Sequence, residues 1–417
     1  MILCAPYVLA ADNQIIPDGA VRVDRGTIVE VGPAAQLTGP ATQVTGPART
    51  DLGQSLLLPG FVNAHTHLEL THLAGRIPPK ADFVDWIRRL VDAMRDADDD
   101  SAVTLDSVRR GRELSLSAGV TTIGDITRLP ALTRPVLAEG PLRTLSFGEV
   151  IAIGRLRNRL NERLTAAADA CTVSEFLQIG ISPHAPYTLE PDGLRACVAR
   201  AVACGLRMCI HLAETANEAE FTADLTGPIR TFFERHHIWD RQVPCPGLSP
   251  VEYAADTGLL GPDALLAHAN YVTDRDIDRI AASGAHVAYC PRTHAAFGHP
   301  PHPFRRMLDR GVNVCVGTDS LASNPSLSVL EELRFLRRND PDLPPALLIE
   351  MGTARAARAL GMSTSVGRIA PGLRADLTAI PLDPDGPSDP MENVLQGNAD
   401  PTCTCVAGRW HGTPPPP

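Results

Sequence analysis

The sequence predicts an α/β protein: a (β/α)8 TIM barrel with a small β-sandwich domain formed by both chain termini. Three observations support this prediction. Eight short apolar segments alternate with helical stretches in the middle of the chain. Nearly every one of these segments ends in a polar residue. The two ends of the chain instead consist of short strand-like runs separated by turn residues, and 417 residues are enough for a barrel plus a small second domain.

The two ends of the chain share one pattern of short strands and turns. Near the start, strands are predicted at residues 21–23, 27–31 and 55–58, and near the end at 375–380 and 403–408. We therefore assign residues 1–58 and 368–417 to the accessory β-sandwich domain. Residues 59–367 form the predicted catalytic barrel.

The barrel strands follow one another in order along the middle of the chain. The first follows Pro59-Gly60 and ends at His67, and the other seven are predicted at residues 120–125, 144–149, 177–182, 208–211, 265–268, 286–290 and 314–317. Apolar residues at helical spacing fill the intervals, as between residues 83 and 94. Residues 217–262 are too long for a simple helix and predict a lid or wall of the active site.

Five side chains at these strand ends are candidate metal ligands. Alternate residues of a strand point the same way, so His65 and His67 present two imidazoles to one point. Three later strand ends supply His211, His268 and Asp319. Because the carboxyl ends of barrel strands form the active-site face, we expect these side chains to lie close together.

Three imidazole nitrogens and one carboxylate suit a catalytic divalent metal that keeps a position open for water. The predicted ligands are His65, His67, His211 and Asp319. Glu214, three residues beyond His211, is predicted to move protons between the water and the substrate. His268 could also ligate the metal, but we expect it to hydrogen-bond to the attacking water. Zinc is the expected ion, and iron(II) and manganese suit the same set.

The composition indicates a soluble globular enzyme with a small-molecule substrate. The formal net charge of -10 and the lack of a basic stripe argue against a nucleic-acid partner. No run approaches the ~20 apolar residues that span a bilayer, and the apolar opening lacks a basic region, so we expect neither a membrane partner nor a signal peptide. A cytoplasmic location is expected by default, and a homodimer because dimers are common.

The ordered motifs resemble those of the amidohydrolase superfamily, in its mononuclear aminohydrolase branch. They are the histidine pair after the first strand, His-Leu-Ala-Glu at 211–214, His-Ala-Asn at 268–270 and Gly-Thr-Asp-Ser at 317–320. The resemblance extends to Gly-Arg-Ile-Ala-Pro-Gly at 367–372 and covers nearly the whole chain. It implies that the four ligands named above bind metal, that Glu214 shuttles protons and that His268 contacts the attacking water, with Asp319 in both the metal and the catalytic set.

The resemblance also bears on the number of metals. Binuclear members of the superfamily bridge two metals with a carbamylated lysine on the fourth strand, where this chain has Ser182-Pro183-His184. Lys80 is the only lysine in the chain, and it lies in the loop region after the first strand. A mononuclear centre is therefore predicted.

The substrate residues are predicted from less specific features. Residues 67–70 and 83–86 look like the corresponding region of aminodeoxyfutalosine deaminases, and residues 182–187 recur in adenosine-type deaminases. In nucleoside-acting relatives a glutamate and a histidine hold the ribose hydroxyls, which makes Glu69 and His184 the candidates. Trp86 is a candidate for stacking on a base, and Arg292 for substrate contact. The segment at 290–299 departs from the Cys-Pro-x-Ser-Asn form common in the branch.

These observations predict a metal-dependent hydrolytic deaminase of an adenine nucleoside-type substrate, with aminodeoxyfutalosine of menaquinone biosynthesis as the leading case. Glu214 favours deamination because expelling ammonia needs protonation of the ring nitrogen and of the leaving amine. The alternative enzyme is a deaminase or chlorohydrolase of a free base or another small N-heterocycle. The non-enzyme alternative is an inert barrel scaffold, which predicts that no metal is bound.

Overall fold

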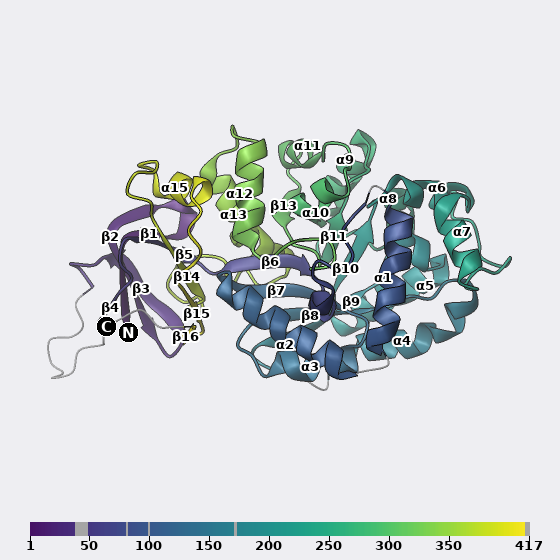
Figure 1. Cartoon of the computed structure of the whole chain (residues 1–417), viewed down its shortest axis with the longest axis horizontal. Helices are drawn as coiled ribbons and strands as arrows, with labels where there is room; N and C mark the ends of the chain where they lie inside the picture. Colours follow the sequence, from purple (N-terminus) through teal and green to yellow (C-terminus); the bar gives the residue numbers. More distant parts are fainter. Residues whose placement is uncertain (38–48, 81, 99–100, 171–172, 413–417) are drawn as a thin grey trace. The chain divides into compact units, whose positions relative to one another are not determined.

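The structure, a computed structural model, describes residues 1–37, 49–80, 82–98, 101–170 and 173–412 (Figure 1). The chain divides into two compact units. The first comprises Met1–Asn63, Arg112–Ile123 and Ser328–Pro417, and the second comprises Ala64–Gly111 and Gly124–Leu327. Every residue of the candidate site described below belongs to the second unit.

Both chain termini contribute strands to one sheet of the first unit. Its order is β16-β15-β14-β5-β1-β2-β3, with β4 paired to β1. Strand β5 pairs antiparallel with β14, which joins the two ends of the chain and confirms the predicted β-rich unit. Alternating apolar side chains supply its core, among them Leu3, Val21, Ile28, Leu57 and Leu377. The strands are β1 (Ile2–Leu9), β2 (Ile15–Asp24), β3 (Thr27–Pro33), β4 (Arg49–Asp51), β5 (Ser55–Pro59), β14 (Leu377–Pro381), β15 (Cys403–Val406) and β16 (Arg409–His411).

Four α-helices and one short 3-10 helix of the described residues lie entirely within the first unit, which also includes Arg112–Ile123. They are η1 (Ala11–Asn13), α12 (Val329–Asn339), α13 (Pro345–Met351), α14 (Ala354–Ala359) and α15 (Pro390–Gln396). Helices α12 to α14 follow the last barrel strand in the sequence, in the range assigned above to the barrel domain. In the structure they belong to the first compact unit. Their packing with α15 accounts for this, because α12 and α13 both contact it.

The second sheet is the predicted parallel barrel of eight strands. Its order, β13-β12-β11-β10-β9-β8-β7-β6, follows the chain without a crossover. A parallel bridge between Thr66 and Asp319 brings its first and last strands together. Gly317 permits this approach, because a Cβ there would lie 2.8 Å from the carbonyl oxygen of His65. The strands are β6 (Phe61–Thr66), β7 (Val120–Thr127), β8 (Arg143–Glu149), β9 (Leu177–Ser182), β10 (Arg207–Leu212), β11 (Ala264–His268), β12 (His286–Tyr289) and β13 (Asn313–Val316).

Helices alternate with these strands, as the sequence pattern predicts (Figure 1). Their ends follow local rules: Gly205 ends α5 in the left-handed conformation, and Thr273 caps α9 by accepting from the backbone N–H of Asp276. The helices are α1 (Phe83–Asp98), α2 (Ser101–Ser117), α3 (Pro130–Ala138), α4 (Leu160–Ala167), α5 (Pro191–Cys204), α9 (Asp274–Ser283), α10 (Pro291–Ala296) and α11 (Phe304–Asp309), with short 3-10 helices η2 (Leu68–Leu73), η3 (Gly154–Arg159) and η4 (Pro186–Thr188).

The long segment between β10 and β11 is helical. It contains α6 (Ala216–Asp224), α7 (Gly227–Arg235) and α8 (Pro250–Asp256). Phe221 and Phe233 from this segment share a hydrophobic cluster with Ile153 and Tyr187 of the barrel loops. That packing holds the segment against the loops at the carboxyl ends of the strands, where a wall of the active site was predicted. Among the helices within the described ranges, none is long and apolar enough to cross a membrane.

Candidate functional site

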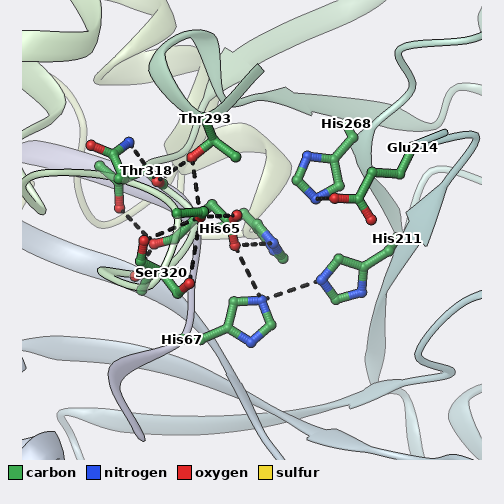
Figure 2. Close-up of polar contacts among 12 residues, drawn as sticks. His65, His67, His211, Glu214, His268, Thr293, Thr318 and Ser320 are labelled. Carbon is green, nitrogen blue, oxygen red and sulfur yellow. Dashed lines mark hydrogen bonds and ion pairs between the residues drawn. The ribbon is translucent and has the colours of Figure 1, made fainter. Parts of the chain in front are cut away.

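Figure 2 shows that the side chains of His65, His67 and His211 meet where β6 and β10 end. Asp319, which follows β13, lies beside them. His67 Nε2 lies 3.2 Å from His211 Nε2 and 3.5 Å from Asp319 Oδ1. His65 Nε2 lies 3.8 Å from the same carboxylate oxygen. The alternation of strand residues brings His65 and His67 to one side, and the closure of the barrel adds Asp319.

This donor set fits a divalent metal ion. Two nitrogen ligands about 2.0–2.1 Å from a tetrahedral metal lie roughly 3.3 Å apart, close to the observed separations. His65 Nε2 is buried and has no hydrogen-bond partner, as expected of an atom that faces an ion. The donor atoms of His65, His268 and Asp319 also lie within 4.8 Å of one another, so His268 is near enough to be a further ligand.

Burial prepares the imidazoles to bind a metal. It lowers the pKa of His211 to about 4 and lowers the pKa values of His65 and His67 well below the usual value, so all three rings are neutral at neutral pH. Burial raises the pKa of Asp319 to about 6, partly offset by the Ser323 hydroxyl, which donates to Oδ2 at 2.6 Å. A bound cation would favour the carboxylate of Asp319, because opposite charges attract.

A second layer of contacts fixes the orientation of the ligands. His211 Nδ1 lies 3.0 Å from the carbonyl oxygen of His184, which can only accept, so Nδ1 carries the proton and Nε2 is free to bind. Cys209 Sγ lies 3.7 Å from His65 Nδ1, the ring nitrogen that does not face Asp319. The backbone N–H groups of Thr318 and Asp319 both donate to the carbonyl oxygen of His65. The candidate ligands are therefore held in place by the barrel itself.

Glu214 and His268 form a pair beside the ligand cluster. Glu214 Oε1 lies 3.5 Å from His268 Nε2 (Figure 2). Burial, with smaller effects from the charges of Asp319 and Glu218, raises the pKa of Glu214 well above the usual value. Burial lowers the pKa of His268 well below its usual value. A carboxyl group that readily holds a proton next to a neutral imidazole is suited to general acid and base chemistry.

Glu218, which the sequence analysis missed, holds the turn that carries Glu214. Its Oε1 accepts from the backbone N–H of Ala213 and its Oε2 from that of Glu214, both at 2.9 Å. Ala213 has a left-handed backbone with φ 51°, which is uncommon for a residue other than glycine. The signal in the sequence was a second glutamate four residues after Glu214, in the first turn of α6.

Left-handed residues recur at the strand ends of the site. His268, the last residue of β11, has φ 72° and the next residue, Ala269, has φ 52°, while Asp319 follows β13 with φ 56°. Each turn redirects the chain directly after its strand. Such backbone conformations persist only where the surroundings determine them.

A pocket of about 410 Å³ adjoins His67. Its polar side includes Glu69, Arg128, Glu149 and His184. Its apolar side comes from α1 and from the segment between β10 and β11, with Ile87, Leu90, Met94, Phe232 and Ile238. A mostly apolar pocket with a few polar groups is typical of small-molecule sites.

Both predicted ribose-binding residues line this pocket, with different freedom to bind. Glu69 Oε1 accepts from Arg128 Nε at 2.9 Å, and Oε2 accepts from Thr127 Oγ1 and the backbone N–H of Arg128. Its two oxygens are thus already supplied with donors. His184 Nδ1 lies 2.9 Å from Thr188 Oγ1, and its Nε2 lies 3.8 Å from Glu149.

Trp86 and Arg292, the other two candidates for substrate contact, do not line the pocket. The indole N–H of Trp86 donates to the carbonyl oxygen of Ile77 at 2.9 Å, and its ring packs against Phe83 and Phe297. Arg292 Nη1 donates to Ser326 Oγ at 2.8 Å. The contacts observed for both are within the protein, and their substrate roles stay predictions.

Comparisons with known proteins agree with this fold. The sequence model of the amidohydrolase family matches residues 56–411. A 5-methylthioadenosine/S-adenosylhomocysteine deaminase of Nitratidesulfovibrio vulgaris is 33% identical over 396 residues, covering 89% of this chain and 81% of that protein. Helicobacter pylori aminofutalosine deaminase, solved with methylthio-coformycin, has a TM-score of 0.84 at 21% identity and covers 98% of this chain and 99% of its own. A zinc-bound adenosine deaminase from Xanthomonas campestris has a TM-score of 0.83 at 23% identity, covering 98% and 92%.

Proposed function

The chain belongs to the amidohydrolase family, which makes it a hydrolase of carbon–nitrogen bonds, and we propose that it removes the exocyclic amine of an adenine nucleoside as ammonia. The observation that carries this proposal is the position of Glu214: its buried carboxyl group lies 3.5 Å from His268 Nε2, beside the cluster of histidine and aspartate side chains that could hold a metal. The deaminase relatives at 33% and 30% identity support it.

His65, His67, His211 and Asp319 are the residues that would hold one divalent metal, and zinc is the ion we propose. A cation bound there supplies Lewis acidity, which brings the deprotonation of water into the neutral pH range. Zinc, iron(II) and manganese all accept this donor set. Elemental analysis of protein purified without chelator identifies the ion, and less than trace metal would favour an inert scaffold instead.

Glu214 carries the proton transfers of the proposed reaction. Its carboxylate takes a proton from the attacking water and delivers it to the ring nitrogen next to the carbon that bears the amine. His268, 3.5 Å away, donates or accepts a hydrogen bond at the attacking oxygen. Glu214 then moves the proton of the added hydroxyl group to the amine, the carbon–nitrogen bond breaks, ammonia leaves, and the added oxygen remains as the ring carbonyl.

The pocket supports a substrate larger than a free base. Its volume of about 410 Å³ lies within the range of ligand sites and exceeds the volume that adenine alone requires. We propose that His184 and Glu149 on the polar side bind the ribose hydroxyls. The carboxylate of Glu69 already accepts from Arg128, so it would contact the ribose only while keeping that bond. The apolar side suits a substituent on the 5′ carbon. We propose a 5′-substituted adenosine, with aminodeoxyfutalosine as the leading case.

A substrate panel tests this proposal by ammonia release. The panel contains aminodeoxyfutalosine, 5′-methylthioadenosine, S-adenosylhomocysteine and adenosine, with guanine, cytosine and a chlorinated triazine as the alternatives. We expect kcat/KM for at least one 5′-substituted adenosine to exceed that for adenosine. Turnover of a free base or a triazine with no activity on any adenosine derivative would exclude the proposed substrate class.

Replacing Glu218 with glutamine is expected to lower kcat by about 10²-fold, because a small displacement of a catalytic group has effects of this size. The amide nitrogen of the new side chain would face one of the two backbone N–H groups that Glu218 now accepts. Glu214 would then lose its fixed position, while the metal ligands stay intact. Steady-state kinetics and metal content are the measurements.

Glu220→Gln is the matched control for this variant. Glu220 lies two residues further along α6 and is exposed. The control should keep the kcat of the unsubstituted protein. Equal kcat values for Glu218→Gln and the control would show that the turn does not need its carboxylate.

A further inference from the structure

His268, at the end of β11, and the next residue, Ala269, both have a left-handed backbone, and this turn orients the side chain of His268. His268 has φ 72° and Ala269 has φ 52°, and neither is glycine. Two backbone hydrogen bonds join this turn to the end of β10. Ala269 N–H donates to the carbonyl oxygen of Leu212, and Tyr271 N–H donates to the carbonyl oxygen of Ala213. These bonds leave the carbonyl oxygen of His268 for another partner.

That partner is His302, from the segment between α10 and α11. His302 Nε2 lies 2.7 Å from the carbonyl oxygen of His268. Burial lowers the pKa of His302 to about 3, so its ring is neutral and has one N–H. Because a carbonyl oxygen only accepts, that N–H must be on Nε2.

The surroundings of His302 fix its ring firmly. It stacks on Tyr289 with 3.9 Å between the ring centroids and 17° between the planes, and His294 meets it edge to face. Its Nδ1 is buried without a hydrogen-bond partner. An unpaired buried acceptor is unfavourable, and an apolar side chain at this position would avoid it. The hydrogen bond from His302 Nε2 to the carbonyl oxygen of His268 compensates for this cost.

We propose that His302 is a positioning residue for the proton transfers: it locks the left-handed backbone of His268 and thereby sets the distance between the imidazole of His268 and Glu214. His302 touches neither the proposed metal ligands nor Glu214 through any hydrogen bond of the described residues. It acts through the backbone of His268. This inference rests on the proposed function, since it assigns Glu214 and His268 to catalysis.

A pair of variants of similar shape tests the bond itself. His302→Gln keeps an N–H donor near the position of Nε2, and His302→Met fills the same space without one. We expect His302→Met to lower kcat by about 10-fold or more, with KM changed less than about threefold and metal content unchanged. His302→Gln should restore kcat to within about threefold of the unsubstituted protein.

His286 provides the matched control. His286 is also buried, and it lies at the start of β12, away from the strand ends that form the site. Its Nδ1 lies 3.1 Å from Asn313 Nδ2. His286→Met should lower thermal stability with kcat unchanged. If His302→Met does not fold, His302→Phe replaces it, because a phenyl ring can also stack on Tyr289.

Crystal structures of the variants give a readout that does not depend on activity. In His302→Met we expect the φ of His268 to leave the left-handed region, or its Nε2 to move further from Glu214 than the present 3.5 Å. Equal kcat in His302→Met and the unsubstituted protein, equal impairment of the Met and Gln variants, or unchanged His268 geometry would each overturn the proposal. An unsubstituted protein without deaminase activity would instead refute the proposed function, and the structures would still test the positioning.

Discussion

Glu214→Gln should abolish deamination and leave the metal content unchanged. Proton transfer by a positioned side chain contributes about 10²–10⁴-fold, and Glu214 is the proposed carrier of every such transfer, so we expect a loss of at least about 10³-fold in kcat. Glutamine keeps the size of the side chain and cannot take up a proton. Glu214 is not one of the four proposed ligands, and its Oε1 lies 3.5 Å from His268 Nε2.

The measurements are kcat, KM and metal content on the same preparation. Glu234→Gln is the control: Glu234 is exposed on α7 and pairs with Arg230. Near-full turnover by Glu214→Gln would show that another group moves the protons. Loss of metal from Glu214→Gln would show instead that Glu214 supports the ion.

Removal of the metal is the second change with a large expected effect. His67 Nε2 and His211 Nε2 face each other at 3.2 Å, and His65 Nε2 is buried with no hydrogen-bond partner, so an ion bound among these nitrogens would stabilise the folded site. A ligand present at a hundred times its Kd stabilises the folded state by about 2.7 kcal/mol, so we expect the chelated protein to lose turnover completely and to unfold at lower temperature.

Turnover, metal content and the unfolding temperature should return together on adding one equivalent of zinc. The control is Glu214→Gln under the same treatment, which should lose and regain thermal stability with the metal but never gain turnover. Full activity after verified removal of all metal would contradict the ligand assignment. Recovery that requires two equivalents would contradict the prediction of a mononuclear centre.

The parts of the site set by strand geometry could be predicted from the sequence. His65 and His67 are two residues apart at the end of an apolar strand, and alternation on a strand is a local property. His211, His268 and Asp319 end later strands, and parallel strands in a barrel bring such ends together. The structure places these five side chains in two groups of three that share His65.

The supporting contacts could not be predicted, because they depend on backbone conformation and on distant partners. Glu69 resembles a ribose-binding residue in sequence, yet its carboxylate is paired with Arg128, 59 residues further along the chain. Glu218 acts on two backbone N–H groups of a turn whose left-handed residue is an alanine. No sequence pattern signals that conformation.

The side chains that form the pocket wall could not be predicted from the sequence either. The length of the segment between β10 and β11 predicted a lid or wall, but length alone does not say which side chains face the substrate. Phe232, Phe233 and Ile238 all line the pocket, and all three also pack in the hydrophobic cluster that contains Phe221. Those positions follow from the packing of α6 and α7, which is tertiary information.

Selection for thermal stability alone is expected to change the left-handed turns at the strand ends and so to lower the activity of the site. Glycine adopts the backbone of Ala213 or Ala269 without steric cost, and strained conformations of this kind cost on the order of 1–3 kcal/mol each. Laboratory evolution that screens only for melting temperature would therefore favour relaxed turns here. Glycine would also make these turns more flexible, so Glu214 and His268 would be held less firmly. The retained variants should therefore be more stable proteins and slower enzymes.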